Sequence, residues 1–187
     1  WKLDEASGVL ASELINNHDG SIVGAAEWNT LTLPPVPSGT SAAIELDGID
    51  DQINIDGYKG ITGTGARTIS AWIRTSHNNP QDRGILSWGI NQTTRKWTFR
   101  IQTQNGTPGT IRIEANGGFF VGNTVVTDGN WHHVAVTWEN DGTPDILDSK
   151  LYLDGVLDAE YGNLTTPPSA SQSIAINTAA SADVRIG

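Results

Sequence analysis

The segment WHHVAVTW at residues 131–138, followed by KLYLDG at 150–155, constrains the fold of this chain more than any other feature. Side chains of a strand point alternately to its two faces, so the two valines share one face with Trp138, and Trp131 lies on the other. Both faces are largely apolar or aromatic, as expected for a strand covered on both sides within two packed sheets. The Asp-Gly pair that ends the second segment indicates a tight hairpin turn.

Alternation of β-branched and aromatic residues recurs along the chain and is broken by Gly, Pro, Asn or Asp roughly every ten residues. This pattern is typical of a β-sandwich or jelly roll, and helical periodicity is scarce. The predicted strands lie at residues 44–46, 52–55, 68–74, 83–89, 97–102, 110–115, 119–126, 132–138, 150–153 and 173–176.

Several segments resemble one protein family when they are taken in order. WKLDEASG at the N-terminus, AIELDGIDDQINI at 43–55 and TISAWIRT at 68–75 are followed by GILSWG, KWTFRIQ and TIRIEANGG, and then by WHHVAVTW. The chain resembles the laminin-G-like (LamG-like) jelly rolls of the concanavalin A-like lectin/glucanase superfamily. The resemblance implies an all-β fold, a two-sheet antiparallel β-sandwich, formed as a single domain over residues 1–187. The family pattern adds a closing strand after a segment like the C-terminal VRIG, so that strand is expected to be missing from this chain.

The formal net charge of the chain is −10, from 21 acidic and 11 basic residues, and the chain has no cysteine. This charge repels polyphosphate, so nucleic acid is not an expected partner. The lack of cysteine excludes disulfides, thiol catalysis and cysteine-based zinc sites. No apolar run approaches the roughly 20 residues that cross a bilayer, so direct membrane insertion is not expected either.

Three aspartates, Asp47, Asp50 and Asp51, cluster in the sequence ELDGIDD. Carboxylates and exposed carbonyls around a tight glycine turn supply the oxygen ligands that Ca²⁺ prefers. Related jelly rolls hold a structural calcium between an N-terminal loop and the first hairpin, so the resemblance adds Asp4 and Asp19 to the expected metal ligands. The alternative is a plain hairpin turn, in which the aspartates are solvated or cap backbone amides.

Glu45, Asp47 and Asp50 also read E-x-D-x-x-D, close to the E-x-D-x-x-E motif of laminarinase-like glycosidases, which share this overall fold. Retaining hydrolysis needs two carboxyl groups about 5 Å apart. The last position is Asp in this chain, and its shorter side chain would move the acid. The surrounding segment fits the family's non-catalytic hairpin better, so an enzyme is not expected.

Aromatic side chains beside loops are candidates for stacking against sugar rings. Trp72, Trp88, Trp131 and Trp138 lie within strand patterns instead and are expected in the core. In GGFF, alternation turns one of the two phenylalanine rings away from the inner face. The loop HNNPQDR offers amide and guanidinium groups that recognise hydroxyls. The candidate ligand-binding residues are Tyr58, Asn78, Asn79, Arg83, Phe119, Phe120 and Tyr161.

His132 and His133 are adjacent in the predicted strand and point to opposite faces, so they cannot chelate one metal ion together. The resemblance implies that both are fold residues, with an imidazole hydrogen-bonded to nearby backbone. No nearby serine with an acidic partner indicates a catalytic triad.

These features favour a non-catalytic recognition module within a larger extracellular or cell-surface protein, such as an adhesin or a carbohydrate-active protein. The expected ligand is a carbohydrate or a protein surface, with Ca²⁺ as a structural cofactor. The rival hypothesis is a structural module that assembles a surface protein and has no soluble ligand. A missing closing strand favours this rival, because an incomplete sheet exposes an edge with which a neighbour can pair.

Overall fold

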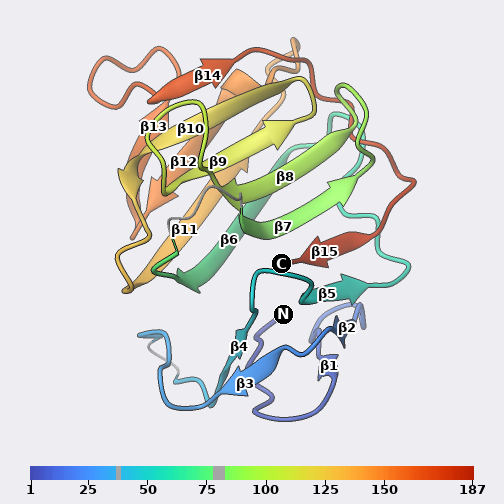
Figure 1. Cartoon of the computed structure of the whole chain (residues 1–187). Helices are drawn as coiled ribbons and strands as arrows, with labels where there is room; N and C mark the ends of the chain where they lie inside the picture. The colour runs from blue at the N-terminus through green and yellow to red at the C-terminus, as the bar shows by residue number, and fades with distance from the viewer. Residues whose placement is uncertain (37–38, 78–82) are drawn as a thin grey trace.

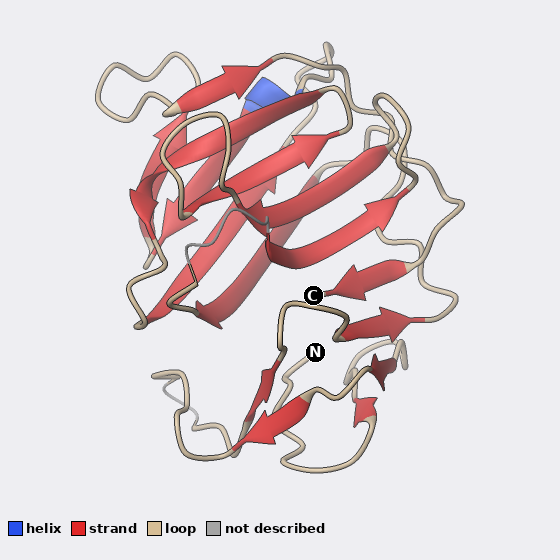
Figure 2. Cartoon of the chain, in the orientation of Figure 1, coloured by secondary structure: helices blue, strands red, loops and turns tan. Residues whose placement is uncertain are grey.

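Residues 1–36, 39–77 and 83–187 are described in the computed structural model, and nearly all regular structure within them is β (Figure 2). The predicted all-β sandwich is confirmed. The large sheet has the strand order β1 (Leu10–Ala11), β2 (Gly20–Val23), β5 (Gln52–Ile55), β15 (Val184–Ile186), β7 (Arg83–Gly89), β8 (Lys96–Ile101), β9 (Thr110–Ala115), β10 (Gly118–Val125) and β14 (Ala170–Gln172). The small sheet has the order β13 (Val156–Glu160), β12 (Ser149–Leu153), β11 (Trp131–Trp138) and β6 (Arg67–Arg74).

Two minor elements complete the fold within the described ranges. The strands β3 (Glu27–Asn29) and β4 (Ala43–Glu45) pair in a separate two-stranded sheet, and the 3-10 helix η1 (Ile146–Asp148) precedes β12. Figure 1 shows β3 and β4 below the sandwich, beside β1 and β2. No helix in the described part of the chain is long and apolar enough to cross a membrane.

The core lies between the large and small sheets, whose strands β7 to β10 pass in front of β6, β11 and β12 in Figure 1. Strand β11 shows how the alternation of side chains along a strand contributes to the core. Val134 and Val136 are fully buried and Trp138 is 1% exposed, whereas every residue between them is only half-buried. The strand therefore has one face toward the core and one toward the outside.

The tryptophans divide between these two faces. Trp97 of β8 and Trp138 of β11 meet edge to face across the sheets, with ring centroids 6.2 Å apart, and Trp88 is buried beside them. Trp72 and Trp131 are half-buried on the outer face of the small sheet, which corrects the expectation that both lie in the core. They are outward because they alternate with the buried residues of β6 and β11, and Trp72 pairs with the outward His133.

A charged side chain, Arg67, occupies the core at the start of β6 and is only 3% exposed. Its guanidinium donates hydrogen bonds to the carbonyl oxygens of Gly63 and Gly65, at 2.9 and 2.8 Å, and to Thr178 Oγ1 at 2.8 Å. These acceptors lie in the segments before β6 and before β15. The guanidinium therefore holds two connecting segments against the sandwich.

The Arg67 guanidinium also lies among three indole rings. Its carbon is 5.9, 4.9 and 5.2 Å from the ring centroids of Trp88, Trp97 and Trp138. Such cation–π contacts are strongest when the cation is desolvated, as it is here. Burial lowers the pKa of Arg67 to about 10, so the group still carries its charge at neutral pH.

Most predicted strands are confirmed to within a residue or two, but the C-terminal third differs. The strand predicted at 173–176 does not form, and Ala175 makes only an isolated bridge to Asp145. Strand β14 lies instead in the preceding segment, which was expected to be a loop. The VRIG segment forms β15, which pairs with both β5 and β7 inside the large sheet.

We expect Arg67→Ala to lower the free energy of unfolding by about 3–5 kcal/mol, because it removes the buried cation and leaves the buried Thr178 and two partly buried carbonyl oxygens without their donor. Urea unfolding followed by tryptophan fluorescence measures the change. Arg95→Ala, at an exposed arginine, is the matched control and should change the value by less than about 0.5 kcal/mol. Equal effects of the two substitutions would contradict a structural role for the buried cation.

Candidate functional site

A row of outward-facing side chains crosses the large sheet, with one residue from each of eight adjacent strands. The strand register connects every neighbour in the row directly. We name it the outer strip, and it consists of Ser21, Asn54, Arg185, Ser87, Thr98, Glu114, Phe119 and Gln172.

The outer strip faces outward because its members alternate with core residues. Asn54 lies between two fully buried isoleucines of β5, and Thr98 lies between Trp97 and Phe99, which are also fully buried. Sequence reasoning did not find this row. Each polar residue flanked by two apolar ones was a visible signal, but only the register shows that the eight residues are neighbours.

A network of charges fixes the middle of the outer strip. Glu114 Oε2 accepts a hydrogen bond from Arg100 at 2.6 Å and forms an ion pair with Arg112 at 2.8 Å. The Arg112 guanidinium carbon also lies 4.0 Å from the ring centroid of Phe119. The three side chains beside Phe119 are 6–22% exposed, so the network is rigid but still within reach of solvent.

Two polar atoms of the outer strip are buried without a partner among the described residues, namely Asn54 Oδ1 and Thr98 Oγ1. Arg185 is exposed and adds a further positive charge to the row. Together with Arg100 and Arg112, it brings three guanidinium groups to this face beside the carboxylate of Glu114, although the whole chain has a net charge of −10. The exposed Arg185 can donate hydrogen bonds to hydroxyl or carboxylate oxygens.

The three aspartates lie in the loop between β4 and β5, and they are brought together there. These two strands belong to different sheets, so the loop is not the hairpin turn that was expected, and we name it the aspartate loop. Asp47, Asp50 and Asp51 each have a carboxylate oxygen within 4.8 Å of the others, and Asp51 is buried. The Asp51 carboxylate accepts hydrogen bonds from the amides of Ala25, at 2.6 Å, and Asp47, at 2.9 Å. Hydrogen bonds from the backbone, first of all from the Ile49 amide, lower the pKa of Asp47. The hydrogen bonds to backbone amides agree with the alternative in which the aspartates only cap a turn. The grouping of the carboxylate oxygens agrees with the expectation of a calcium site.

The structure places the other two expected metal ligands elsewhere. Asp4 lies 3.5 Å from Lys2, and Asp19 accepts a hydrogen bond from the Glu13 amide. Within the described ranges, neither belongs to a group of three or more acidic or histidine side chains spaced for one metal ion.

The predicted ligand-binding residues do not form one site. Phe119 belongs to the outer strip, but Phe120 is fully buried in the core, which removes it from the candidate ligand contacts. Tyr58 is half-buried and stacks on His18, with ring centroids 4.4 Å apart. Tyr161 is 57% exposed and follows β13 of the small sheet.

The remaining candidates come from the segment between β6 and β7. Asn78 and Asn79 lie outside the described residues. Arg83 begins β7 and donates a hydrogen bond of 2.5 Å to the Gly48 carbonyl oxygen, in the aspartate loop. This contact makes Arg83 a link between β7 and the aspartate loop.

The glycosidase alternative required Glu45 to act with the aspartates that follow it. Glu45 instead accepts a hydrogen bond from Asn29 Nδ2 across the two-stranded sheet, at 3.1 Å. It is not part of the group that Asp47 and Asp50 form within the described residues. The structure therefore does not assemble the E-x-D-x-x-D pattern into one set of carboxylates.

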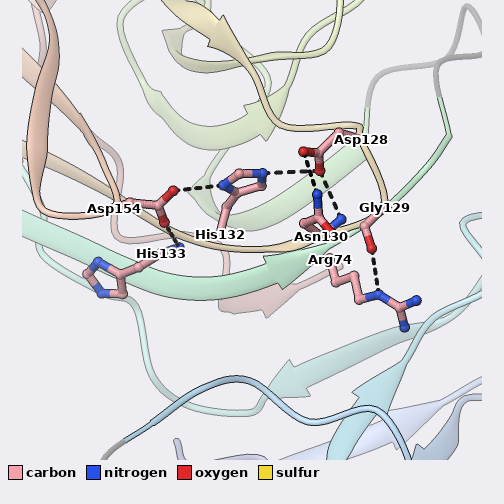
Figure 3. Close-up of polar contacts among 7 residues, drawn as sticks. All are labelled: Arg74, Asp128, Gly129, Asn130, His132, His133 and Asp154. Atoms are coloured by element: carbon pink, nitrogen blue, oxygen red, sulfur yellow. Dashed lines mark hydrogen bonds and ion pairs between the residues drawn. The ribbon is translucent and has the colours of Figure 1, made fainter.

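His132 lies between two carboxylates near the N-terminal end of β11 (Figure 3). Its Nδ1 is 2.8 Å from Asp154, in the turn between β12 and β13, and its Nε2 is 3.2 Å from Asp128, in the loop before β11. The partners are side chains and not the backbone that was expected. Burial alone would lower the pKa of His132, but the hydrogen bonds and charges of Asp154 and Asp128 outweigh it and raise the pKa.

With both ring nitrogens bonded, His132 clamps two turns together. Asp154 also accepts a hydrogen bond from the His133 amide, and Arg74 donates one to the Gly129 carbonyl oxygen beside Asp128. Figure 3 shows Asp154, His132 and Asp128 in a row, with the bond between Arg74 and Gly129 below them. The arrangement leaves neither imidazole nitrogen for a substrate or a metal ion.

Comparison with known proteins gives one family. A family model described as the Concanavalin A-like lectin/glucanases superfamily matches residues 47–185, which run from the aspartate loop to β15. No curated protein matches the chain. Among solved structures, the chain is similar to domain 4 of AbnA, a GH43 extracellular arabinanase from Geobacillus stearothermophilus, in complex with arabinotriose. The sequence identity is 14% and the TM-score 0.49, over 95% of this chain and 80% of that one.

The raised pKa of His132 predicts a pH-dependent part of the stability. The contacts of His132 with Asp154 and Asp128 stabilise the fold fully when the pH is below the pKa of the imidazole in the unfolded chain, about 6.5. This stabilisation is lost as the pH rises through the raised pKa of His132 in the folded chain. Urea unfolding of the wild type and His132→Gln should therefore differ more at about pH 6 than at about pH 8. His77→Gln, at an exposed histidine, is the control. A difference that grows with pH would contradict the assignment.

Proposed function

Because the chain belongs to the Concanavalin A-like lectin/glucanase superfamily, we propose that it is a non-catalytic carbohydrate-binding module. In this proposal a polysaccharide chain lies along the outer strip. The module works outside the cell or at its surface, as part of a larger protein.

The outer strip carries this proposal because its shape suits a linear polymer. Eight adjacent strands separated by about 4.8 Å give a row on the order of 35 Å long. Seven of the eight positions carry a polar side chain, and Ser21, Arg185 and Gln172 are exposed, whereas Thr98 is only 8% exposed. Such a row forms hydrogen bonds with successive sugar units in the same way, which a compact pocket cannot do.

Phe119 supplies an apolar contact within this polar row. The Arg112 guanidinium lies over the ring, and in this proposal a sugar ring stacks on the opposite side. Arg112 is itself held by Glu114, at 2.8 Å. A ring that is already ordered loses little side-chain entropy on binding, which favours affinity.

We expect Phe119→Ala to weaken binding to a linear polysaccharide by about tenfold, since the substitution removes the stacking surface. Affinity electrophoresis or calorimetry with soluble xylan, mixed-linkage glucan and arabinan measures the change. Tyr161→Ala is the matched control, because Tyr161 is an exposed aromatic residue away from the outer strip. It should bind like the wild type.

Equal losses from the two substitutions would contradict the outer strip as the site. A folded chain that binds no polysaccharide in the panel but self-associates with concentration would favour the rival structural module. One observation supports that rival: Val9, Leu10, Leu14 and Ile15, in and around the edge strand β1, are 48–84% exposed. Exposed apolar side chains at a sheet edge favour pairing with another chain.

We also propose that Asp47, Asp50 and Asp51 hold a structural Ca²⁺. Their carboxylates provide three of the six to eight oxygen ligands that this ion takes, and backbone carbonyls or water would provide the rest. The side chains of Asp47 and Asp51 already accept hydrogen bonds from backbone amides, so we expect the aspartate loop to keep its shape without the ion. The Asp50 carboxylate makes no hydrogen bond to the described residues, and we expect it to be the ligand that depends most on calcium.

Calcium should therefore raise the melting temperature by a few degrees at concentrations well above its Kd, because it binds only the folded chain. Asp50→Asn should remove most of this shift. Asp56→Asn, at an exposed acid on another turn, is the control and should keep it. Identical melting temperatures in calcium and in EDTA would rule out the calcium site. This result would not bear on the proposal that the outer strip binds a polysaccharide.

A further inference from the structure

Charge is distributed unevenly over this fold. The chain has 21 acidic and 11 basic residues, yet the strands of the large sheet contain a single acid, Glu114. The other acids of the described ranges lie in loops, in η1, in β3 and β4, or in the small sheet. The same strands of the large sheet contain five basic residues, namely Arg83, Lys96, Arg100, Arg112 and Arg185.

On β8, two of these basic residues flank the outer strip. Lys96 and Arg100 lie two residues before and two residues after Thr98, which belongs to the strip. Side chains two residues apart in a strand point to the same face, and the alternate residues Trp97 and Phe99 are fully buried in the core. Lys96 makes no hydrogen bond or ion pair with any residue of the described ranges. Its ammonium group can therefore pair with a ligand at the outer face.

Arg112 and Arg185 extend this basic surface to the two sides of β8. Arg112 lies opposite Arg100 in the register of β8 and β9, and it is two residues before Glu114. Arg185 is exposed on β15, which β7 separates from β8, so the two strands are about 10 Å apart. Within the part of the chain that the structure describes, the Arg185 guanidinium has no hydrogen-bond or ion-pair partner. Four basic groups thus share this face with one carboxylate.

The acids that adjoin the outer strip in the sequence lie beyond the ends of β5 and β15. Asp183 precedes β15 and is paired with Lys59, at 2.5 Å. Asp56 follows β5, and the aspartate loop precedes it. The Ca²⁺ that we propose for this loop would offset its carboxylates. Along the strip itself, basic groups consequently outnumber acidic ones.

Such a surface favours an anionic ligand at contact, although the chain as a whole is negative. Hydrogen bonds from guanidinium or ammonium groups to an anion are about twice as strong as neutral ones, and the two parallel donors of a guanidinium match the oxygens of a carboxylate or a sulfate. Repulsion by the acidic loops acts over longer distances. It is largely screened at physiological ionic strength, where the Debye length is about 8 Å.

We propose that the outer strip binds a polysaccharide whose sugar units carry anionic groups, in preference to a neutral one. This inference rests on the proposed function, in which a sugar ring stacks on Phe119. Carboxylate or sulfate groups of the bound polymer pair with Arg185 and Lys96. Arg100 and Arg112 add positive charge from within the face, where their contacts with Glu114 hold them in place.

The test uses two matched pairs of probes. One pair is the tetramer of galacturonate and its methyl ester, and the other is a sulfated galactan tetramer and its desulfated form. Calorimetry at about pH 7 and about 0.15 M salt should show about tenfold tighter binding of the charged member of at least one pair. The pair that shows it identifies the anion as carboxylate or sulfate. This preference should shrink at about 1 M salt, because the contacts are exposed.

Substitutions that remove one positive charge assign the preference to the strip. Arg185→Gln and Lys96→Gln should each weaken binding of the charged probe by about threefold and leave the neutral probe unchanged. Lys150→Gln is the matched control, because it removes the same charge from the small sheet, where Lys150 is exposed and paired with Glu160. It should bind both probes like the wild type. Phe119→Ala should weaken both, and thermal melting checks that each variant is folded.

Two results would overturn this inference alone. The first is that the neutral member binds as tightly as the charged one in both pairs, or that none of the four probes binds while neutral xylan or glucan does. The second is a charge preference that survives both Arg185→Gln and Lys96→Gln. In either case, binding of neutral polysaccharides that depends on Phe119 would still support the proposed function. A folded chain that binds no polysaccharide at all would overturn both.

Discussion

The buried guanidinium of Arg67 is the contact on which the packing of the two sheets depends. It lies against Trp88 and Trp97 of the large sheet and against Trp138 of the small sheet. A buried cation is usually balanced by a carboxylate, whereas here three indole rings and three oxygen acceptors share that role. The contact fixes the start of β6 in the small sheet relative to β8 in the large sheet, which carries part of the outer strip.

Strands with strong apolar alternation could be predicted from the sequence. The bounds of β6 and β11 were predicted to within a residue, because one face of each is decided by valine and isoleucine side chains. Strand β14, with the sequence ASQ, has no such pattern and forms only because it pairs with β10, which is about 50 residues earlier in the chain. Alternation also assigned Trp72 and Trp131 to the core, since it separates two faces without showing which of them is covered.

The candidate site was less predictable than the fold. The sequence indicated that the aspartates of ELDGIDD would gather, because they are close in the chain. It indicated that one ring of GGFF would point outward, but not which one, and the buried Phe120 settles this. The outer strip depends on the register of eight strands, some separated by more than 100 residues. Non-local hydrogen bonding of this kind leaves no local signal in a sequence.

The outer strip crosses the strands of the large sheet and does not run along any one of them, and this has a consequence for valency. Its members come from strands between β2 and β14, so a polymer bound along the strip spans most of the width of the sheet. A long polymer extends beyond the module in both directions and offers room for further copies. Retention of several copies on one polymer would reflect avidity more than the affinity of a single strip.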